Sequence, residues 1–327
     1  MNNPTYLYTE TAFHHEGSYD YLKQLIDETK RIGANGIKFQ VLTNTNDFIT
    51  SKHKDYKLLS DFCLSYDEWK DIFTYTQESG LDIILMPLNI EAMELSHFAR
   101  YIDIHSVSFN DSDLLDKINT KDCEIIIGVG GRTEEEIDHL IRFFGEKVKI
   151  LMAGFQSFPS DLKDVNLGKI SYYKQKYPTL DIGYADHSSY KDPFAVLSND
   201  YARLLGATVF EKHITIHEGE EKTDYASAVS GDKIKQIIDN LNFINNYVLN
   251  GKYDQMSQPE KNYRNRQLIG VAATDLPAGT VLEKKDISLK LHHEFENHYT
   301  TIESLVGKKL LVNLDKDAPF NTKSLQE

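Results

Sequence analysis

Eight short β-rich runs alternate with amphipathic helical stretches over most of this 327-residue chain. A strand, a helix and the next parallel strand form a right-handed unit, and eight such units close into a barrel. The alternation therefore predicts an α/β fold, a (β/α)8 TIM barrel, with a doubly wound open sheet as the competing interpretation. The expected strands are Thr5–Thr9, Gly36–Val41, Asp82–Met86, Ile102–Val107, Glu124–Val129, Val148–Met152, Leu180–Tyr184 and Thr208–Glu211.

The stretches between these runs repeat apolar residues at helical spacing. Tyr19–Ile32 and Glu134–Phe144 are two examples, each with one apolar face. Thr133 precedes the second segment as an N-cap, and Glu136 follows three residues later, which is the pattern of a capping box. We therefore expect these segments to be helices that cover the strands.

The pattern changes after a last long helix expected at Ser230–Leu249. The next residues, 251–263, are polar and include Gly, Gln and Pro, which is typical of a linker. We expect a barrel domain over residues 1–250, this linker, and a small β-rich domain over residues 264–327. A domain of roughly 60 residues seldom has enough core to stand alone, so it should pack on the barrel or on a second subunit.

The composition excludes several classes of protein. A net charge of −14 argues against nucleic acids and anionic membranes as partners. No run of 18 or more apolar residues is present, and the N-terminus lacks a basic segment followed by an apolar one, so neither a membrane span nor a secretory signal is expected. Cys63 and Cys123 cannot build a disulfide framework and are expected to be reduced, as in a cytoplasmic protein.

Two histidines follow neighbouring strands, where a barrel of this kind carries its chemistry. His187 follows the seventh strand and His213 the eighth. Adjacent strands lie about 4.8 Å apart, so the two imidazoles can converge on one divalent ion. Two histidine ligands leave positions open for catalysis, and Asp186, or substrate and water, would complete the shell. The alternative is that both histidines are structural residues of the rim.

Two glutamates at strand ends are candidate acid–base groups. Glu10 and Glu211 end the first and eighth strands, and burial there can raise a carboxylate pKa. The alternative is that they form ion pairs with Lys38 and Lys212. Lys38 also offers a cation at the mouth for a phosphate or carboxylate. The long polar segment 42–65 is expected to be a lid or a wall of the substrate pocket.

Six sequence motifs follow one another along nearly the whole chain. They are Glu10-Thr-Ala-Phe-His-His15-Glu-Gly17, Ile32-Gly-Ala-Asn-Gly-Ile-Lys38-Phe-Gln40, Gly183-Tyr-Ala-Asp-His187-Ser, Gly206-Ala-Thr-Val-Phe-Glu211-Lys-His213, Thr223-Asp224-Tyr-Ala-Ser227, and Arg266-Gln-Leu with Asp275-Leu-Pro-Ala-Gly279. In this order they resemble the motifs of the sialic acid synthase family. The last resembles the antifreeze-like (SAF) domain that ends these synthases.

The resemblance implies a transferase that forms a carbon–carbon bond. Such enzymes condense phosphoenolpyruvate with an N-acylated amino sugar, such as N-acetylmannosamine, to a nonulosonic acid. His187 and His213 would hold Mn²⁺, with Mg²⁺ or Co²⁺ as alternatives, and the ion would polarise the sugar aldehyde. Glu10 and Glu211 would contact the sugar and transfer protons.

The same resemblance assigns substrate-binding residues. Lys38 would pair with phosphoenolpyruvate, while Gln40 and Asp224 match sugar-side positions. Ser108 and Gln156 stand at further substrate-binding positions. Arg266 matches an arginine that the small domain delivers to a neighbouring subunit, which implies a domain-swapped homodimer.

Several residues depart from the family pattern, mostly at phosphate-binding positions. They are His105 in place of a lysine, Asn110 in place of a glutamate, Met86 in place of a threonine, Gly128 and Ala185 in place of serines, and Gln156 and Phe158 in place of Asn and Tyr. Each lost hydrogen bond would cost about 0.5–3 kcal/mol. Two other hypotheses therefore stay open: a metal-dependent sugar aldolase or isomerase that does not use phosphoenolpyruvate, and a non-catalytic sugar-binding relative.

Overall fold

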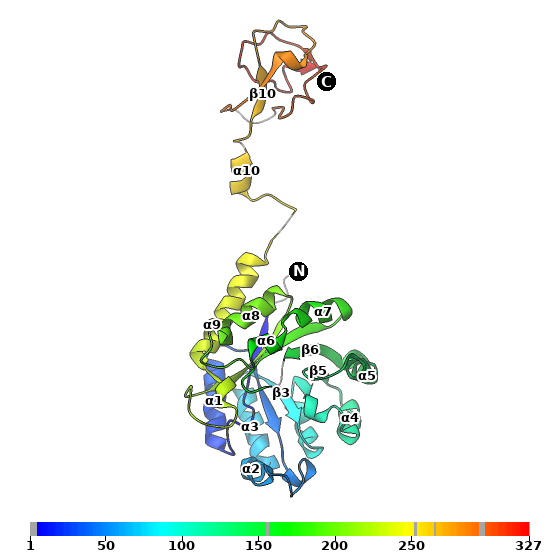
Figure 1. Ribbon diagram of the computed structural model, residues 1–327, viewed down its shortest axis with the longest axis vertical. Helices are drawn as coiled ribbons and strands as arrows, with labels where there is room; N and C mark the ends of the chain where they lie inside the picture. Colours follow the sequence, from blue (N-terminus) through cyan, green and yellow to red (C-terminus); the bar gives the residue numbers. More distant parts are fainter. Residues whose placement is uncertain (1–4, 155–156, 252–253, 265, 294–297, 327) are drawn as a thin grey trace. The chain divides into compact units, whose positions relative to one another are not determined.

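Eight parallel strands, β1 to β8, form a closed barrel in which each strand pairs with the next and β1 pairs with β8 (Figure 1). Tyr6 of β1 lies opposite Val209 of β8, so the sheet has no open edge at this seam. The predicted TIM barrel is confirmed, and the open sheet is wrong. The strands are Tyr6–Glu10, Gly36–Val41, Asp82–Pro87, Tyr101–Ile104, Glu124–Gly128, Val148–Gly154, Asp181–Asp186 and Val209–Thr215.

The computed structural model describes residues 5–154, 157–251, 254–264, 266–293 and 298–326. The chain divides into two compact units, Met1–Gly251 and Lys252–Glu327, which are described separately. Among the helices of the described part, none combines the length and the apolar character that crossing a membrane requires. Both cysteines are free and half-buried.

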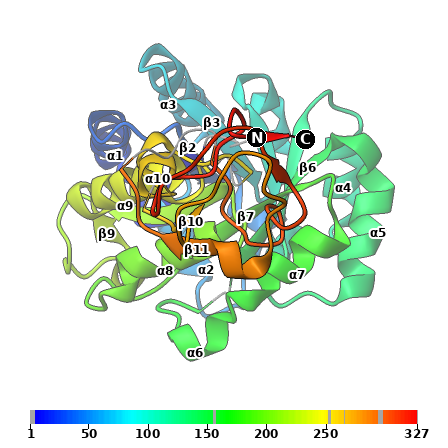
Figure 2. The same cartoon turned by 90° about the horizontal axis from the view of Figure 1, so that it is seen from above.

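Helices surround the strands as an outer ring (Figure 2). Their boundaries agree well with the helical spacing in the sequence: α1 spans Tyr19–Arg31 and α5 spans Glu134–Phe144. The other helices of this unit are α2 (Tyr56–Phe62), α3 (Tyr66–Glu78), α4 (Ser112–Asn119), α6 (Leu162–Val165), α7 (Gly168–Lys176), α8 (Phe194–Leu204) and α9 (Gly231–Phe243), the last continued by a π-helical turn at Ile244–Val248. The segment expected to be a lid, residues 42–65, contains α2 and a short 3-10 turn, Thr45–Asp47.

Seven of the eight strands end at residues other than those expected, β2 being the exception, and the ends of β4, β7 and β8 bear on the site. β4 stops at Ile104, because Ser106–Ser108 turns into a 3-10 helix. β7 continues to Asp186, which pairs with Lys212. β8 continues to Thr215, because a short strand β9 (Val229–Ser230) pairs with its end. The longer β8 places His213 inside the strand and not after it.

Alternate residues of each strand face the barrel interior and the helices. In β2, Lys38 is among the inward side chains, whereas Ile37, Phe39 and Val41 belong to the core between strands and helices. A second apolar cluster forms inside the barrel and includes Tyr8, Ile84, Ile126 and Met152. This inner cluster is the floor beneath the polar side chains at the carboxyl ends of the strands.

The second unit contains two small antiparallel ladders. β10 (Ile269–Ala272) pairs with β11 (Ile287–Lys290), and β12 (Lys309–Leu310) pairs with β13 (Leu325–Gln326). Their apolar side chains enclose a separate core, which includes the fully buried Phe320. The β-rich character expected of this part of the chain is confirmed.

The segment expected to be a polar linker contains a short helix, α10 (Gln258–Arg264). Ser257 caps it: the backbone N–H of Ser257 donates to Glu260 Oε2 at 2.6 Å, and the backbone N–H of Glu260 donates to Ser257 Oγ at 3.3 Å. The sequence analysis missed this capping pattern because no apolar face accompanies it.

The capping box of α5 provides a test of local stability. The backbone N–H of Glu136 donates to Thr133 Oγ1 at 3.3 Å, and the Glu136 carboxylate accepts from the Thr133 N–H at 2.8 Å. We expect Thr133→Ala to lower the free energy of unfolding by about 1 kcal/mol in chemical denaturation. Thr74→Ala is the matched control, since Thr74 is exposed within α3. Alanine is the better helix former there, so an equal loss in both variants would contradict the capping role.

Candidate active site

Four neighbouring strands, β7, β8, β1 and β2, bring the main polar side chains together. Their register places Glu10 opposite both Lys38 and His213. Glu211 lies two residues before His213 on the same face of β8, and His187 directly follows β7. All five side chains are therefore buried at the carboxyl end of the barrel, where such folds carry their active sites.

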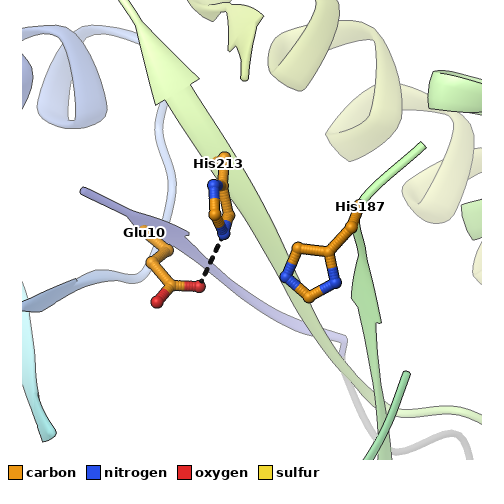
Figure 3. A group of neighbouring side chains, drawn as sticks. All are labelled: Glu10, His187 and His213. Atoms are coloured by element: carbon orange, nitrogen blue, oxygen red, sulfur yellow. Dashed lines mark ion pairs between the residues drawn. The ribbon is translucent and has the colours of Figure 1, made fainter. Parts of the chain in front are cut away.

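Glu10, His187 and His213 form a group whose ligand atoms all lie within 4.8 Å of one another. Figure 3 shows the three side chains pointing toward one another from separate strands. His213 Nε2 is 3.1 Å from Glu10 Oε2, and the two imidazole rings are nearly perpendicular, with centroids 4.9 Å apart. Two imidazoles and one carboxylate are a donor set that suits a first-row divalent ion and leaves positions open.

The protonation of His187 also favours a metal ligand. Burial lowers the pKa of His187 well below its usual value, and the positive field of His213 adds to this effect. The imidazole therefore stays neutral, which is the form that binds metal. Its Nδ1 is buried and has no hydrogen-bond partner among the described residues.

Asp186 does not join this group, although the sequence analysis considered it as a third ligand. Its carboxylate accepts hydrogen bonds from the backbone N–H of Ser188 at 2.8 Å and from the Asn199 side chain at 3.0 Å. It also pairs with Lys212 at 3.0 Å. The side chain is therefore held on the outer side of the barrel, and Glu10 is the carboxylate that faces the histidines.

Lys38 lies at the centre of a buried ionic cluster. Its ammonium is 2.7 Å from Asp103, 2.9 Å from Glu211 and 3.3 Å from Glu10, and each of these side chains is at most 2% exposed. The Tyr8 hydroxyl donates to Glu211 at 2.7 Å. The sequence predicts that Lys38 offers its cation at the mouth of the barrel. In the structure three acidic side chains surround its ammonium group. Both glutamates thus pair with Lys38, while Lys212 pairs elsewhere.

Tyr8 and Asp103 were not predicted as site residues, although the sequence carries a signal for each of them. Asp103 is the single charged residue in the apolar run of β4, and it shares the inward phase of Tyr101. Tyr8 lies two residues before Glu10 and therefore faces the same interior.

The two glutamates differ in protonation. Burial raises the pKa of Glu10, but the charges of Lys38 and His213 outweigh it and hold that pKa well below its usual value. Burial and the negative charge of Glu10 raise the pKa of Glu211 well above its usual value. Two neighbouring carboxyl groups with opposite shifts are the usual arrangement for a base or anion beside an acid.

Gln40 and Asp224 are two further side chains that interact with Glu10. The Gln40 amide donates to Glu10 Oε1 at 2.9 Å. Asp224 is in the left-handed region, with φ 61°. Burial raises the pKa of Asp224; the charge of His213 opposes this shift and that of Glu10 adds to it, so its carboxyl faces the same cluster.

The loop that carries Asp224 is held by the loop after β1. His14 Nδ1 contacts the Thr223 carbonyl oxygen at 2.8 Å, and the backbone N–H of Thr223 donates to Glu16 at 2.8 Å. These contacts fix the residue next to Asp224. The sequence analysis assigned no role to His14 or Glu16, because they act through the backbone of a distant segment.

Three further residues are predicted to bind substrate: Ser108, Gln156 and Arg266. Ser108 is buried in the 3-10 turn after β4. Gln156 lies outside the described residues. Arg266 belongs to the second unit, where its guanidinium lies 5.6 Å from the centre of the Tyr263 ring.

Several residues that depart from the family pattern bring apolar or aromatic side chains to the site. Met86 packs with Leu42 and Leu88. A Cβ atom on Gly128 would lie 3.3 Å from His105 Nδ1, so the small residue makes room for the imidazole. The Phe158 ring contacts His187 edge to face, with centroids 4.8 Å apart, and stacks at 5.7 Å on His213.

Comparison with known families gives two matches. The NeuB family matches residues 25–253, and the SAF domain matches residues 271–326. A 28% identical relative is an uncharacterised protein of Methanocaldococcus jannaschii, with 88% of this chain and 85% of that protein covered. The N-acetylneuraminate-9-phosphate synthase of Mus musculus is 24% identical, with 99% and 93% covered. A pseudaminic acid synthase of Campylobacter jejuni is 26% identical, with 93% and 92% covered.

Solved structures agree with the fold. A protein assigned to spore coat polysaccharide biosynthesis in Chromobacterium violaceum superposes with a TM-score of 0.87 at 22% identity, over 99% of this chain and all of the other (100%). The N-acetylneuraminic acid synthetase of Leptospira borgpetersenii gives a TM-score of 0.72 at 23% identity, over 81% of this chain and 92% of the other.

His15, in the loop after β1, is a fully buried imidazole. Its ring meets Trp69 edge to face with centroids 5.8 Å apart, and its Nδ1 accepts the backbone N–H of Gly17 at 3.1 Å. Burial, together with the neighbouring His14, lowers the pKa of His15 from 6.5 to about 4.

We expect His15→Gln to remove a pH-dependent part of the stability. Between pH 6.5 and 4 the unfolded chain binds a proton that folded His15 refuses. The stabilisation is therefore complete above pH 6.5 and falls by about 3 kcal/mol as the pH approaches 4. Chemical denaturation at a series of pH values measures this loss in the wild type and in the variant.

His97→Gln is the matched control, because His97 is exposed. This variant should lose stability with falling pH in the same way as the wild type. Parallel profiles for the wild type and His15→Gln would contradict the assignment.

Proposed function

The chain belongs to the NeuB family, and we propose that it condenses phosphoenolpyruvate with an N-acylated amino sugar to a nonulosonic acid. The observation that carries the proposal is the group of Glu10, His187 and His213 beside the Lys38 cluster at the carboxyl end of the barrel. The synthases of sialic and pseudaminic acid among the relatives support this substrate class.

The metal in this proposal is divalent, with Mn²⁺ preferred and Mg²⁺ or Co²⁺ as alternatives. His187, His213 and Glu10 would hold it, since all three offer donor atoms within 4.8 Å of one another. When bound, the ion supplies Lewis acidity toward the sugar aldehyde.

The chain's own residues supply binding and proton transfer. The enol carbon of phosphoenolpyruvate forms a bond to the aldehyde carbon, water adds to the resulting cation and returns a proton to Glu211, and the tetrahedral intermediate releases inorganic phosphate to leave the ketone. Glu211, whose raised pKa keeps its proton, would donate it to the aldehyde oxygen. Gln40, Asp224 and the ionised Glu10 would hold the sugar hydroxyl and N-acyl groups.

The donor side would use Lys38, Ser108 and Gln156. Lys38 would act mainly through its charge, because its ammonium already contacts three carboxylates. Arg266 would come from the small domain of a partner subunit in a domain-swapped homodimer. The proposal further assigns residues 1–250 to the synthase domain, 251–263 to the linker, 264–327 to the SAF domain, and the protein to the cytoplasm.

A second candidate function is favoured by the side chains at the positions expected to bind the phosphate of phosphoenolpyruvate. Met86 is part of an apolar cluster, and Gly128 and Ala185 carry no hydrogen-bonding side chain. A phosphate group would therefore meet few side-chain donors there. Metal-dependent aldol or isomerase chemistry on a sugar, without phosphoenolpyruvate, is the alternative.

The test is an assay of the full-length, Mn²⁺-loaded protein with phosphoenolpyruvate and a panel of N-acylated hexosamines. We expect phosphate release with at least one sugar and a product whose mass equals the condensed nonulosonic acid. His187→Ala and His213→Ala should each reduce the rate by more than about 100-fold, because loss of a ligand exceeds the effect of a supporting residue. His139→Ala, on an exposed histidine of α5, is the control and should keep the wild-type rate.

The outcomes separate the candidate functions. No phosphate release with any sugar, from folded and metal-loaded protein, would overturn the synthase. A change in the sugar without phosphoenolpyruvate would support the aldolase or isomerase. Metal and sugar binding without any turnover would indicate a non-catalytic relative.

A further inference from the structure

Lys212 is a buried lysine that the proposed chemistry does not use. It lies between Glu211 and His213 on β8, so its side chain leaves the strand on the opposite face, away from the barrel interior. The side chain is 1% exposed. Its ammonium donates to Asp186 Oδ2 at 3.0 Å, to the Asp186 carbonyl at 3.2 Å and to the Ser188 carbonyl at 3.3 Å.

These acceptors stand on both sides of His187. Asp186 in turn accepts the backbone N–H of Ser188 and the amide of Asn199. The carbonyl of His187 itself accepts the backbone N–H of Ser160 at 2.8 Å. The turn that carries His187 is thus held at three consecutive residues, and Lys212 contacts two of them.

The His187 imidazole has no such restraint of its own. Its Nδ1 has no hydrogen-bond partner within the described ranges. A histidine that binds metal usually donates its second ring N–H to an acceptor, which fixes the direction of the ring. Here the backbone of the turn has to provide that orientation, with the Phe158 ring packed against the imidazole.

We propose that Lys212 is a positioning residue for the metal pair, which orients His187 by tying Asp186 and Ser188 to β8. The inference rests on the proposed metal site. One strand would then serve both histidines: His213 faces the ion directly, and Lys212 holds the neighbouring turn so that His187 meets it. Loss of the ammonium would also leave the Asp186 carboxylate buried without a cation, which favours rearrangement of the turn.

The test measures Co²⁺ binding to the full-length protein by titration and by its ligand-field absorption, without any turnover. Lys212→Met should weaken Co²⁺ affinity by about 10- to 100-fold and change the spectrum, because the ligand geometry changes. Lys147→Met is the matched control. Lys147 also donates to two backbone carbonyls, those of Asn119 and Lys121 at 2.6 and 2.7 Å, but it precedes β6 at the opposite end of the strands.

The control should lose stability and keep the wild-type affinity and spectrum. If Lys212→Met binds Co²⁺ as the wild type does, the proposal is overturned and the lysine is only structural. If Lys212→Met does not fold, Asp186→Asn decides: it removes the charge pair but keeps the lysine, so a smaller loss of affinity supports the proposal and no loss overturns it. Absence of Co²⁺ binding by the wild type would overturn the metal site of the proposed function, and this inference with it.

Discussion

One ammonium group contacts three buried acidic side chains inside the barrel, and the rest of the site depends on these contacts. Lys38 holds Glu10 ionised, and the ionised Glu10 faces His213. Burial, together with the negative charge of Glu10, raises the pKa of Glu211, so this side chain keeps its proton. Buried ionic groups of this kind seldom add stability, since their desolvation offsets their attraction. Their presence here is therefore explained better by chemistry than by folding.

The sequence predicted the barrel because period-two and period-3.6 patterns alternate along it, and those patterns reflect which face each element buries. It also predicted Glu10, His187 and His213 at one rim, since parallel strands end together. It could not predict how charges pair. The pairing of Lys38 with Asp103 at 2.7 Å, and of Lys212 with Asp186 at 3.0 Å, joins side chains of different strands and depends on how the barrel closes. The capped helix α10 was missed because its signal is a single serine and glutamate without an apolar face.

The positions that differ from the family pattern are occupied by well-packed groups. Met86 belongs to the apolar cluster under the lid segment, and His105 takes the space that a side chain on Gly128 would need. Phe158 covers the two histidines with a ring that has no hydroxyl. These replacements fit one another, so the side of the site expected to bind the donor is packed by a different set of side chains from that of the family pattern.

Three consecutive ionisable residues of β8, Glu211, Lys212 and His213, have a consequence for folding. Glu211 and His213 need the polar interior, and Lys212 needs Asp186 on the outer face. A slip of one residue in the pairing of β8 would turn Lys212 into the barrel and push the Glu211 and His213 side chains against the helices. A one-residue error in the pairing of β8 is therefore penalised by the same side chains that form the site.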